Sequence, residues 1–341
     1  MQNTLNLYPI DYPFETLVSR ISGDSPKTIL NPDFQRKYKW DKEGWVRASK
    51  FIESCLMRIP LPSCYFAEDE ENKHLVIDGV QRLTTVQKFF NDEFALEGMN
   101  IFKELEGKKF SELGDYKSEL ENTTIRCIVL RKDNPKKLIR EIFARLNQGA
   151  VKLSDQEIRH AIYPGKLDEL LQKLSLNPNI SNFGINSNPR TDSRESEEQV
   201  LRFFAFSNDL NLLNYDSKLG DFLDEYMENN VEISDAEIIE LENKFIAAIQ
   251  NCRVVFEEDV FTNPTNERTK QGLVYYDLLM CTVGLLDSTL VLQKKDKIRS
   301  AYYSLFDDGA FVKTLSGGLQ QKTSILRRRN LWNPLLQEAL N

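Results

Sequence analysis

The sequence predicts an α+β protein in which a mixed N-terminal half is followed by a mostly α-helical C-terminal half. The runs with the β-branched and apolar composition of strands all fall within the first 130 residues: Cys64–Ala67, His74–Ile77 and Thr123–Leu130. From Asn134 onward apolar residues recur at helical spacing, and no convincing strand follows. A chain of 341 residues suggests two domains, which we place at residues 1–165 and 166–341.

The first half contains a predicted hairpin flanked by helices. Asp41 is expected to cap a helix over Glu43–Met57. The polar stretch Glu68–Asn72 (EDEEN) is expected to be the loop that joins the first two strands. Leu83–Phe90 has the spacing of a helix, and Thr123–Leu130 (TTIRCIVL) is the best strand of the chain.

The helical part begins with two helices separated by a turn. Pro135 is placed at the start of the first helix, where its missing N–H group costs nothing. Ser154, with Glu157 three residues later, has the pattern of a capping box that opens the second helix. Pro164-Gly165 ends that helix, and residues 166–341 predict several more.

The net charge is concentrated in one segment. The chain has 52 acidic and 44 basic residues, a formal net charge of −8, and residues 221–250 alone contain nine acidic residues and one basic residue. The N-terminal 165 residues are neutral, with 25 residues of each sign, so the charge does not oppose DNA contact there. The acidic segment is either a solvated helix face, a docking surface for a basic partner, or a guard that keeps DNA off the helical half.

Cysteine, histidine and hydropathy patterns exclude several classes of protein. The five cysteines have no CxxC spacing and are expected to be buried thiols in a reducing cytosol, not zinc ligands. The two histidines, His74 and His160, do not supply the constellation of an HNH nuclease. Because no run of 18 apolar residues and no signal-peptide pattern is present, we expect a cytoplasmic protein without a membrane span.

The first candidate site is Val76–Thr85 (VIDGVQRLTT), where an apolar strand leads into Asp-Gly and a helix then begins. This geometry directs backbone N–H groups, the helix dipole and Arg82 toward one point, which suits a phosphate. Asp78 at the strand end could hold a divalent cation or orient water. The alternative is a tight turn in which the arginine pairs with a carboxylate, and composition alone favours that alternative.

The second candidate is Asn31–Trp40 (NPDFQRKYKW), in which aromatic side chains alternate with cationic and polar ones: Phe34, Gln35, Arg36, Tyr38 and Trp40. Aromatic rings among cations suit stacking on bases and contacts to phosphate. A surface loop anchored in the core by its aromatic residues explains the pattern equally well.

The third candidate is Phe143–Arg159 (FARLNQGAVKLSDQEIR), a helix, a glycine turn and a capped helix that would make a rigid corner. The polar side chains that could line a site there are Arg145, Asn147, Glu157 and Arg159. A corner without a ligand is the better local interpretation. Near the C-terminus, the adjacent arginines 327–329 are expected to be solvated, because they point to different faces of a helix.

Together and in this order, the three motifs resemble those of the N-terminal domain family of GmrSD-type, modification-dependent restriction systems, which has a ParB/sulfiredoxin-like fold. The family pattern P-x-[FY]-Q-R-x-Y-x-W is similar to Pro32–Trp40, and IDGQQRLTT is similar to Ile77–Thr85. The pattern F-x-R-[LI]-N-x-G-x-x-L-S-x-x-E-[IL]-R is similar to Phe143–Arg159. Val80 replaces the first glutamine of the DGQQR core, which bears more on hydrolysis than on binding.

The resemblance, which covers about residues 10–165, implies a nucleotide-binding domain, often a nucleoside triphosphatase, that acts in defence against foreign DNA. It implies catalytic roles for Asp78, Gln81 and Arg82, with Mg²⁺ at Asp78 and a nucleoside triphosphate as cofactors. The nucleotide-binding residues that it implies are Asp78, Gly79, Gln81, Arg82, Thr84, Thr85, Arg145 and Asn147. The DNA-binding residues that it implies are Phe34, Gln35, Arg36, Tyr38 and Trp40.

Many relatives continue into an HNH-like nuclease domain, for which this chain lacks the histidines. The resemblance therefore implies a separate sensor subunit that binds DNA, modified or unmodified, and controls a nuclease partner, with the helical half as a docking or regulatory domain. The alternatives are a DNA-binding module without turnover and, less favoured, a metal-dependent DNA nuclease. The sequence leaves open the nucleotide, the partner and whether the chain forms an oligomer.

Overall fold

The chain, described by a computed structural model, divides into two compact units, Met1–Leu153 and Ser154–Asn341. The structure describes residues 4–23, 25–30, 38, 40–41, 44–69, 71–146, 154–180, 194–265 and 271–341. The division precedes helix α6 (Asp155–Ile162), whereas the boundary expected near residue 165 lies beyond that helix.

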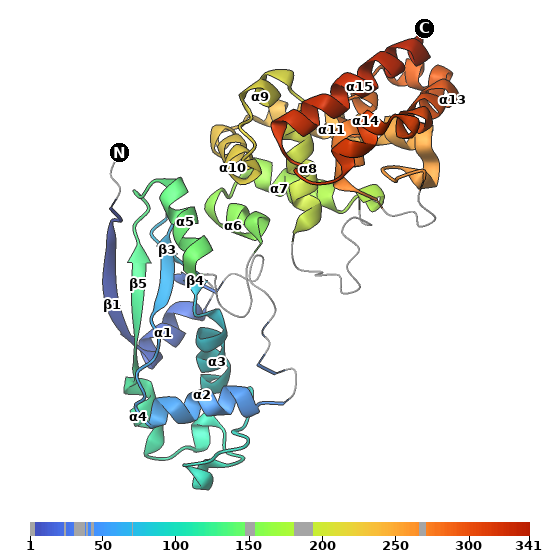
Figure 1. Cartoon of the computed structure of the whole chain (residues 1–341). Helices are drawn as coiled ribbons and strands as arrows, with labels where there is room; N and C mark the ends of the chain where they lie inside the picture. The colour runs from blue at the N-terminus through green and yellow to red at the C-terminus, as the bar shows by residue number, and fades with distance from the viewer. Residues whose placement is uncertain are drawn as a thin grey trace. The chain divides into compact units, whose positions relative to one another are not determined.

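The first unit is built on a five-stranded mixed sheet with the strand order β1-β5-β3-β4-β2. Figure 1 shows β1, β5, β3 and β4 side by side. The pairs β1–β5 and β3–β4 are antiparallel, and the pairs β3–β5 and β2–β4 are parallel. The strands are β1 (Leu7–Pro13), β2 (Thr28–Ile29), β3 (Cys64–Glu68), β4 (His74–Asp78) and β5 (Thr124–Leu130). The helices are α1 (Phe14–Ile21), α2 (Val46–Leu56), α3 (Val80–Phe90), α4 (Tyr116–Asn122) and α5 (Lys136–Leu146), with 3₁₀ turns at Lys103–Leu105 and Phe110–Glu112.

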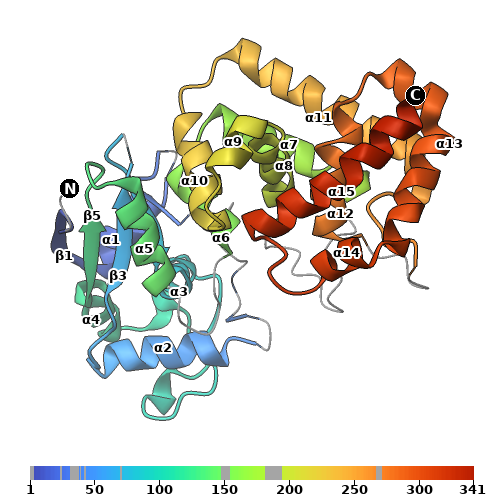
Figure 2. The same ribbon diagram turned by 45° about the horizontal axis from the view of Figure 1, so that its top comes forward.

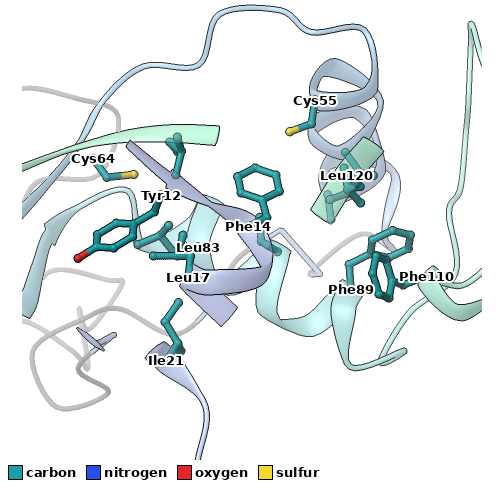
Figure 3. Close-up of a cluster of buried hydrophobic side chains, with 14 of the residues drawn as sticks. Tyr12, Phe14, Leu17, Ile21, Cys55, Cys64, Leu83, Phe89, Phe110 and Leu120 are labelled. Carbon is teal, nitrogen blue, oxygen red and sulfur yellow. The ribbon is translucent and has the colours of Figure 1, made fainter. Parts of the chain in front are cut away.

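The core of this unit lies between one face of the sheet and helices α1, α2 and α3. Alternate residues of β5, Ile125, Cys127 and Val129, are buried on this face, because successive side chains of a strand point to opposite sides. Figure 3 shows the side chains that gather there from the strands and helices, among them Tyr12, Phe14, Leu17, Cys55, Leu83 and Phe89. Aromatic and aliphatic side chains from these elements therefore form one continuous hydrophobic cluster.

The predicted hairpin and the predicted third strand are both confirmed. β3 and β4 pair antiparallel, and β5 spans nearly the whole expected run. β1 was not predicted, because Pro9 and Pro13 interrupt its pattern. Proline is tolerated in an edge strand, and β1 is the edge strand beside β5.

Two helices of this unit begin at other residues than expected. Helix α2 begins at Val46 with Trp45 at the N-cap position, so the prediction that Asp41 caps it was wrong. Helix α3 begins at Val80, three residues before the expected start at Leu83. The earlier start brings Gln81 and Arg82 into the first turn of the helix.

The second unit is helical in the residues that the structure describes, and the α+β fold class is therefore confirmed. Its one recorded extended pairing outside the helices is the isolated bridge between Thr262 and Gln271. Helix α15 lies beside α13 and α14 (Figure 2). The helices are α6, α7 (Lys166–Ser175), α8 (Glu195–Phe206), α9 (Asp209–Asn214), α10 (Leu219–Asn229), α11 (Asp235–Phe256), α12 (Leu273–Met280), α13 (Ser288–Ser304), α14 (Gly309–Val312) and α15 (Lys322–Leu340).

Within the described parts of both units, no helix has the length and apolar character needed to cross a bilayer. All five cysteines are buried free thiols, as the sequence predicts. The predicted capping box of α6 is also confirmed, with Ser154 and Glu157 bonded to each other's backbone N–H groups.

Buried arginines join the helices of the second unit. Arg202 on α8 binds Asp277 on α12 through two donors, one of them Nε at 3.1 Å. Arg328 and Arg329 on α15 are buried and donate to backbone carbonyl groups of neighbouring segments. The prediction that the arginine run is solvated therefore holds for Arg327, which is exposed, and was wrong for the other two.

Part of the acidic segment stabilises helices. Glu237 belongs to the capping box that Ser234 forms at the start of α11. Glu242 pairs with Lys173 on α7 at 2.6 Å. These two side chains therefore have partners within the second unit, and the solvated helix face and the docking surface both stay predictions.

His74 lies buried at the start of β4 with one ring nitrogen unpaired. Its Nε2 is 3.3 Å from the Tyr8 hydroxyl oxygen, and its Nδ1 has no hydrogen-bond partner. Burial, together with the charge of Arg20, lowers the pKa of His74 below its ordinary value of 6.5, while the charges of Glu68 and Asp69 oppose this shift. The ring is therefore neutral in the folded chain at neutral pH.

We expect the first unit to lose stability as the pH falls below 6.5. The unfolded chain binds a proton on His74 near pH 6.5, whereas the native chain binds it at lower pH, so protons favour unfolding in that window. The free energy of unfolding in urea should be measured for wild type and for His74→Gln. The value for wild type minus the value for His74→Gln should decrease as the pH is lowered from 7.5 to 5.5. A difference that stays constant over this range would contradict a buried neutral His74.

Candidate functional site

The turn between β4 and α3 has the best-defined geometry of the three candidate sites. Asp78 ends the strand, Gly79 has a φ of +102°, and α3 begins at Val80. Residues with a side chain rarely adopt this backbone conformation. A Cβ atom at Gly79 would also lie 2.3 Å from the Sγ atom of Cys64 on β3. Glycine is therefore required here for two reasons, its backbone conformation and the close approach of β3.

Arg82 closes this turn with three hydrogen bonds. Its Nη2 donates to Asp78 Oδ2 at 2.9 Å and to the carbonyl oxygen of Ser63 at 3.2 Å. Its Nη1 donates to the carbonyl oxygen of Pro62. The Arg82 side chain is 14% exposed and the Asp78 side chain 48% exposed. The guanidinium group is thus held among protein acceptors, while the carboxylate remains accessible.

The first turn of α3 supplies backbone donors beside that carboxylate. The first four N–H groups of a helix have no partner within the helix, and together with the helix dipole they favour an anion. The N-cap residue is Gly79, which has no side chain to accept a bond from them. Val80 and Gln81 hold the first two helical positions and are partly buried. The turn therefore places an oxygen that can bind a cation next to N–H groups that can bind an anion.

The two threonines of the motif differ in accessibility. Thr84 is partly exposed, whereas Thr85 is 0% exposed. The Thr85 hydroxyl donates to the Gln81 carbonyl oxygen at 2.7 Å and lies 2.7 Å from the Tyr38 hydroxyl oxygen. Thr85 presents no surface to a ligand in this conformation, so the structure places it as a support of α3.

Tyr38 and Trp40, the described aromatic residues of the second motif, are partly buried in the first unit. The ring of Tyr38 lies 6.0 Å from that of Trp45, and the ring of Trp40 lies 5.7 Å from that of Phe51. The guanidinium carbon of Arg47 is 5.2 Å from the centre of the Trp40 ring. Burial raises the pKa of Tyr38 to about 12. These contacts agree with a loop anchored by its aromatic residues, and DNA binding by the two rings stays a prediction.

Several predicted site residues are not brought to the turn by the described structure. Phe34, Gln35, Arg36 and Asn147 lie outside the described residues. Arg145 on α5 is 73% exposed and pairs with Glu141 at 2.7 Å. Among the described residues, no hydrogen bond or ion pair joins Arg145 to Asp78 or Arg82, so its predicted nucleotide contact stays a prediction.

The end of the third motif serves the second unit. Glu157 is engaged in the capping box of α6. Arg159, with 1% of its side chain exposed, binds Asp224 on α10 at 2.8 Å and Glu198 on α8 at 2.9 Å. For Glu157 and Arg159 the structure thus favours a corner without a ligand over a site lining.

Sequence reasoning missed three residues that form the back of the turn: Pro62, Ser63 and Cys64. Two of them act through backbone carbonyl groups, for which no side-chain pattern exists. Cys64 acts through its position against Gly79, and it lies opposite Cys127 in the pairing of β3 with β5. The hydrogen bond between the two thiols, together with burial, raises the pKa of Cys127 well above its usual value.

Asp78 is the carboxylate of this turn that could hold a metal ion. In the part of the chain that the structure describes, no three His, Cys, Asp or Glu side chains are grouped to bind one. A cation at Asp78 would therefore take most of its ligands from elsewhere. Mg²⁺ is commonly bound in this way, by one or two carboxylates with phosphate oxygens and water.

A comparison with known families classifies this part of the chain. The model of the family described as GmrSD restriction endonuclease, N-terminal domain, matches residues 14–164. Residues 14–164 are therefore similar to the N-terminal domain of GmrSD restriction endonucleases. The match contains all three motifs, confirms the resemblance that they predict, and is to a family that belongs to restriction systems. No significant match was found among curated proteins or among solved structures.

The family match and the first compact unit do not end at the same residue. The family match continues to residue 164 and so includes α6, which belongs to the second unit. The sequence of the third motif therefore spans the division between the units. The ParB/sulfiredoxin-like architecture of the domain stays a prediction.

Replacing Gly79 with alanine should lower the free energy of unfolding of the first unit by about 2–5 kcal/mol. The left-handed backbone costs an alanine about 1–2 kcal/mol, and the contact with Cys64 adds a packing penalty of about 1–3 kcal/mol. Gly107→Ala is a matched control, because Gly107 also has a positive φ, of +77°, but open space around it.

Urea unfolding of the two variants would separate the backbone term from the packing term. The free energy of unfolding should fall more in Gly79→Ala than in Gly107→Ala. The double variant Gly79→Ala/Cys64→Ala should recover part of the difference in free energy between these two variants. Equal losses of unfolding free energy at both glycines would show that the contact with Cys64 does not contribute to the penalty.

Proposed function

We propose that this chain is a nucleotide-binding sensor subunit of an anti-phage restriction system, which hydrolyses a nucleoside triphosphate, recognises DNA and controls a nuclease partner. The family match supports the restriction role. The single observation that carries the nucleotide assignment is the β4–α3 turn, where the accessible carboxylate of Asp78 adjoins the N-terminus of α3.

In this proposal each group of the β4–α3 turn has a separate role in binding a nucleoside triphosphate. The N–H groups of the first turn of α3 bind phosphate oxygens. Asp78 holds Mg²⁺ or orients water, and Gln81 orients the nucleotide or the attacking water. Mg²⁺, when bound, supplies neutralisation of phosphate charge. Phosphoryl transfer depends chiefly on positioning and charge stabilisation, which these groups are suited to provide.

Arg82 contributes to this site by orienting Asp78 as well as by its charge. Its donors point to Asp78 and to two carbonyl groups at the entry of β3. A phosphate bound directly by Arg82 would have to share or replace one of these acceptors. The ion pair keeps Asp78 at the helix N-terminus, where the carboxylate and the N–H groups can act on the same ligand.

Val80 is expected to affect the rate of nucleotide hydrolysis more than the affinity for nucleotide. It holds the helical position at which the family pattern has a glutamine, so one amide group is absent from the first turn. Backbone N–H groups do not depend on that side chain, whereas orientation of water would. We therefore expect nucleotide binding to be retained and hydrolysis to be slow.

Arg82→Ala should weaken nucleotide binding at least tenfold, about 1.4 kcal/mol. The substitution removes the anchor shared by Asp78 and the entry of β3. Calorimetric titration with ATP and with GTP in the presence of Mg²⁺ would measure the change. Arg126→Ala is the control, because it breaks an exposed ion pair of the same unit, to Asp11, and should bind like wild type. Equal affinity of wild type and Arg82→Ala would remove Arg82 from the site.

The alternative function is a DNA-binding module without turnover, in which the same turn holds the DNA backbone. In this alternative the half-buried Trp40 ring, with the Arg47 guanidinium beside it, would contact nucleic acid in the second motif. DNA affinity that falls steeply with salt would support this alternative. Triphosphate hydrolysis in DNA-free buffer would favour the nucleotide-dependent sensor.

Trp40→Ala should weaken DNA binding about fivefold or more and leave nucleotide binding intact. Stacking of a base on an aromatic side chain contributes about 1–3 kcal/mol, and Trp40 does not belong to the β4–α3 turn. Fluorescence anisotropy with a labelled duplex and calorimetry with nucleotide would measure the two affinities. Trp40→Phe serves as the control, since it keeps an aromatic ring against Phe51 and should bind DNA nearly as wild type. Unchanged DNA binding by Trp40→Ala would exclude the ring from DNA recognition.

A further inference from the structure

We propose that Tyr38 is a positioning residue of the nucleotide site, whose hydroxyl group holds the first turn of α3 in place through Thr85. This inference rests on the proposed nucleotide function and assigns to that site a residue from a different motif. Tyr38 precedes α2, whereas the site is formed by β4 and α3. Two hydrogen bonds join Tyr38 to the site, one between Tyr38 and Thr85 and one between Thr85 and Gln81.

The donors of this connection follow from counting hydrogen atoms. The hydroxyl of Thr85 has one hydrogen, and it is donated to the Gln81 carbonyl oxygen at 2.7 Å. The contact of 2.7 Å between the Tyr38 and Thr85 hydroxyl oxygens must therefore use the hydrogen of Tyr38. Since burial raises the pKa of Tyr38 to about 12, the phenol keeps this hydrogen at neutral pH. The direction of the connection is from Tyr38 through Thr85 to Gln81.

The ring of Tyr38 is held by its surroundings. It lies 6.0 Å from the ring of Trp45, which stacks on Phe94 at 4.4 Å. The backbone N–H of Trp45 donates to the carboxylate of Glu97 at 2.8 Å. The Lys88 ammonium group, on α3 itself, is 5.7 Å from the centre of the Tyr38 ring. The hydroxyl is therefore presented to Thr85 by a packed aromatic group, not by a freely rotating side chain.

The bond from Thr85 to Gln81 reaches the part of α3 that faces the ligand. A threonine that donates to the carbonyl four residues earlier alters the local geometry of a helix. Gln81 and Arg82 lie in the turn that this bond constrains. If the Tyr38 hydroxyl is removed, the fully buried Thr85 oxygen loses its donor and can reorient, which releases the constraint on Gln81.

This role differs from the DNA contact expected for the second motif. The Tyr38 hydroxyl is bonded to Thr85, and its ring is packed beside Trp45. A positioning role predicts that loss of the hydroxyl changes nucleotide affinity and leaves DNA affinity unchanged. A DNA-reading role predicts the opposite result.

The test uses the full chain and four variants: Tyr38→Phe, Thr85→Val, Thr85→Ser and the double variant Tyr38→Phe/Thr85→Val. Loss of one buried hydrogen bond corresponds to about a three- to tenfold change in affinity. Tyr38→Phe and Thr85→Val should each weaken binding of Mg²⁺-ATP or Mg²⁺-GTP by that factor, measured by calorimetry. The double variant should bind about as weakly as a single one, because both changes break the same connection. Thr85→Ser keeps the hydroxyl and should bind like wild type.

Tyr116→Phe is the matched control. It also removes one tyrosine hydroxyl from the first unit, one that donates to Glu104 at 2.9 Å, far along the chain from α3. It should leave nucleotide affinity unchanged. Thermal unfolding of every variant identifies any that fails to fold, and the Thr85→Val and Thr85→Ser pair then decides the result. Effects of the two single changes that multiply in the double variant would overturn the proposal.

Hydrogen exchange without nucleotide separates this inference from the proposed function. The amides of Leu83–Val86 should exchange faster in Tyr38→Phe than in wild type and Tyr116→Phe. If wild type binds nucleotide and Tyr38→Phe binds equally well, the positioning role is overturned and the proposed function stands. If wild type binds neither ATP nor GTP, the proposed function fails, and unchanged exchange in Tyr38→Phe would show that the connection itself is also absent.

Discussion

The candidate site depends on the hydrogen bonds of one guanidinium group, that of Arg82. Asp78 ends β4 and Arg82 lies in the first turn of α3, so their ion pair closes the turn over Gly79. The bonds to the carbonyl groups of Pro62 and Ser63 add the entry of β3, the neighbouring strand of the sheet. Because the side chain is mostly enclosed, water competes weakly for these bonds. The end of β4, the start of α3 and the entry of β3 therefore form one rigid unit, which is called the Arg82 corner below.

The glycine of the Arg82 corner follows from the short distance between α3 and β3. The Sγ atom of Cys64 occupies the space into which a side chain at position 79 would extend. Cys64 in turn lies opposite Cys127 in the sheet, so the inner side of the turn is filled by the core. The accessible side is that of Asp78. A ligand that approaches there meets the carboxylate and the N-terminus of α3 together.

Local patterns in the sequence predicted the elements whose stability is local, and the contacts between distant segments could not be predicted. The hairpin of β3 and β4 and the capping box at Ser154 depend on neighbouring residues, and both are confirmed. The turn at Asp78–Arg82 was also found from its sequence, because a strand, a glycine and a helix start follow one another. The carbonyl acceptors of Arg82 and the burial of Arg328 depend on which segments meet in space. β1 was not predicted because proline in a sequence counts against a strand. An edge strand nevertheless tolerates proline, and β1 is an edge strand.

Arginines of both units show why an arginine in a motif is weak evidence for a phosphate. Arg159 and Arg202 are buried in the second unit and are neutralised by carboxylates. Arg82 makes the same kind of contact with Asp78. Removing an acceptor from a buried guanidinium group leaves a buried charge without a partner, so a phosphate that displaced one of its acceptors would first have to compensate for the broken bond. The N–H groups at the start of α3 face no such competition from an N-cap side chain, because that residue is Gly79. Nucleotide binding at the Arg82 corner would therefore depend first on the helix N-terminus and Asp78, with Arg82 as the group that holds the two together.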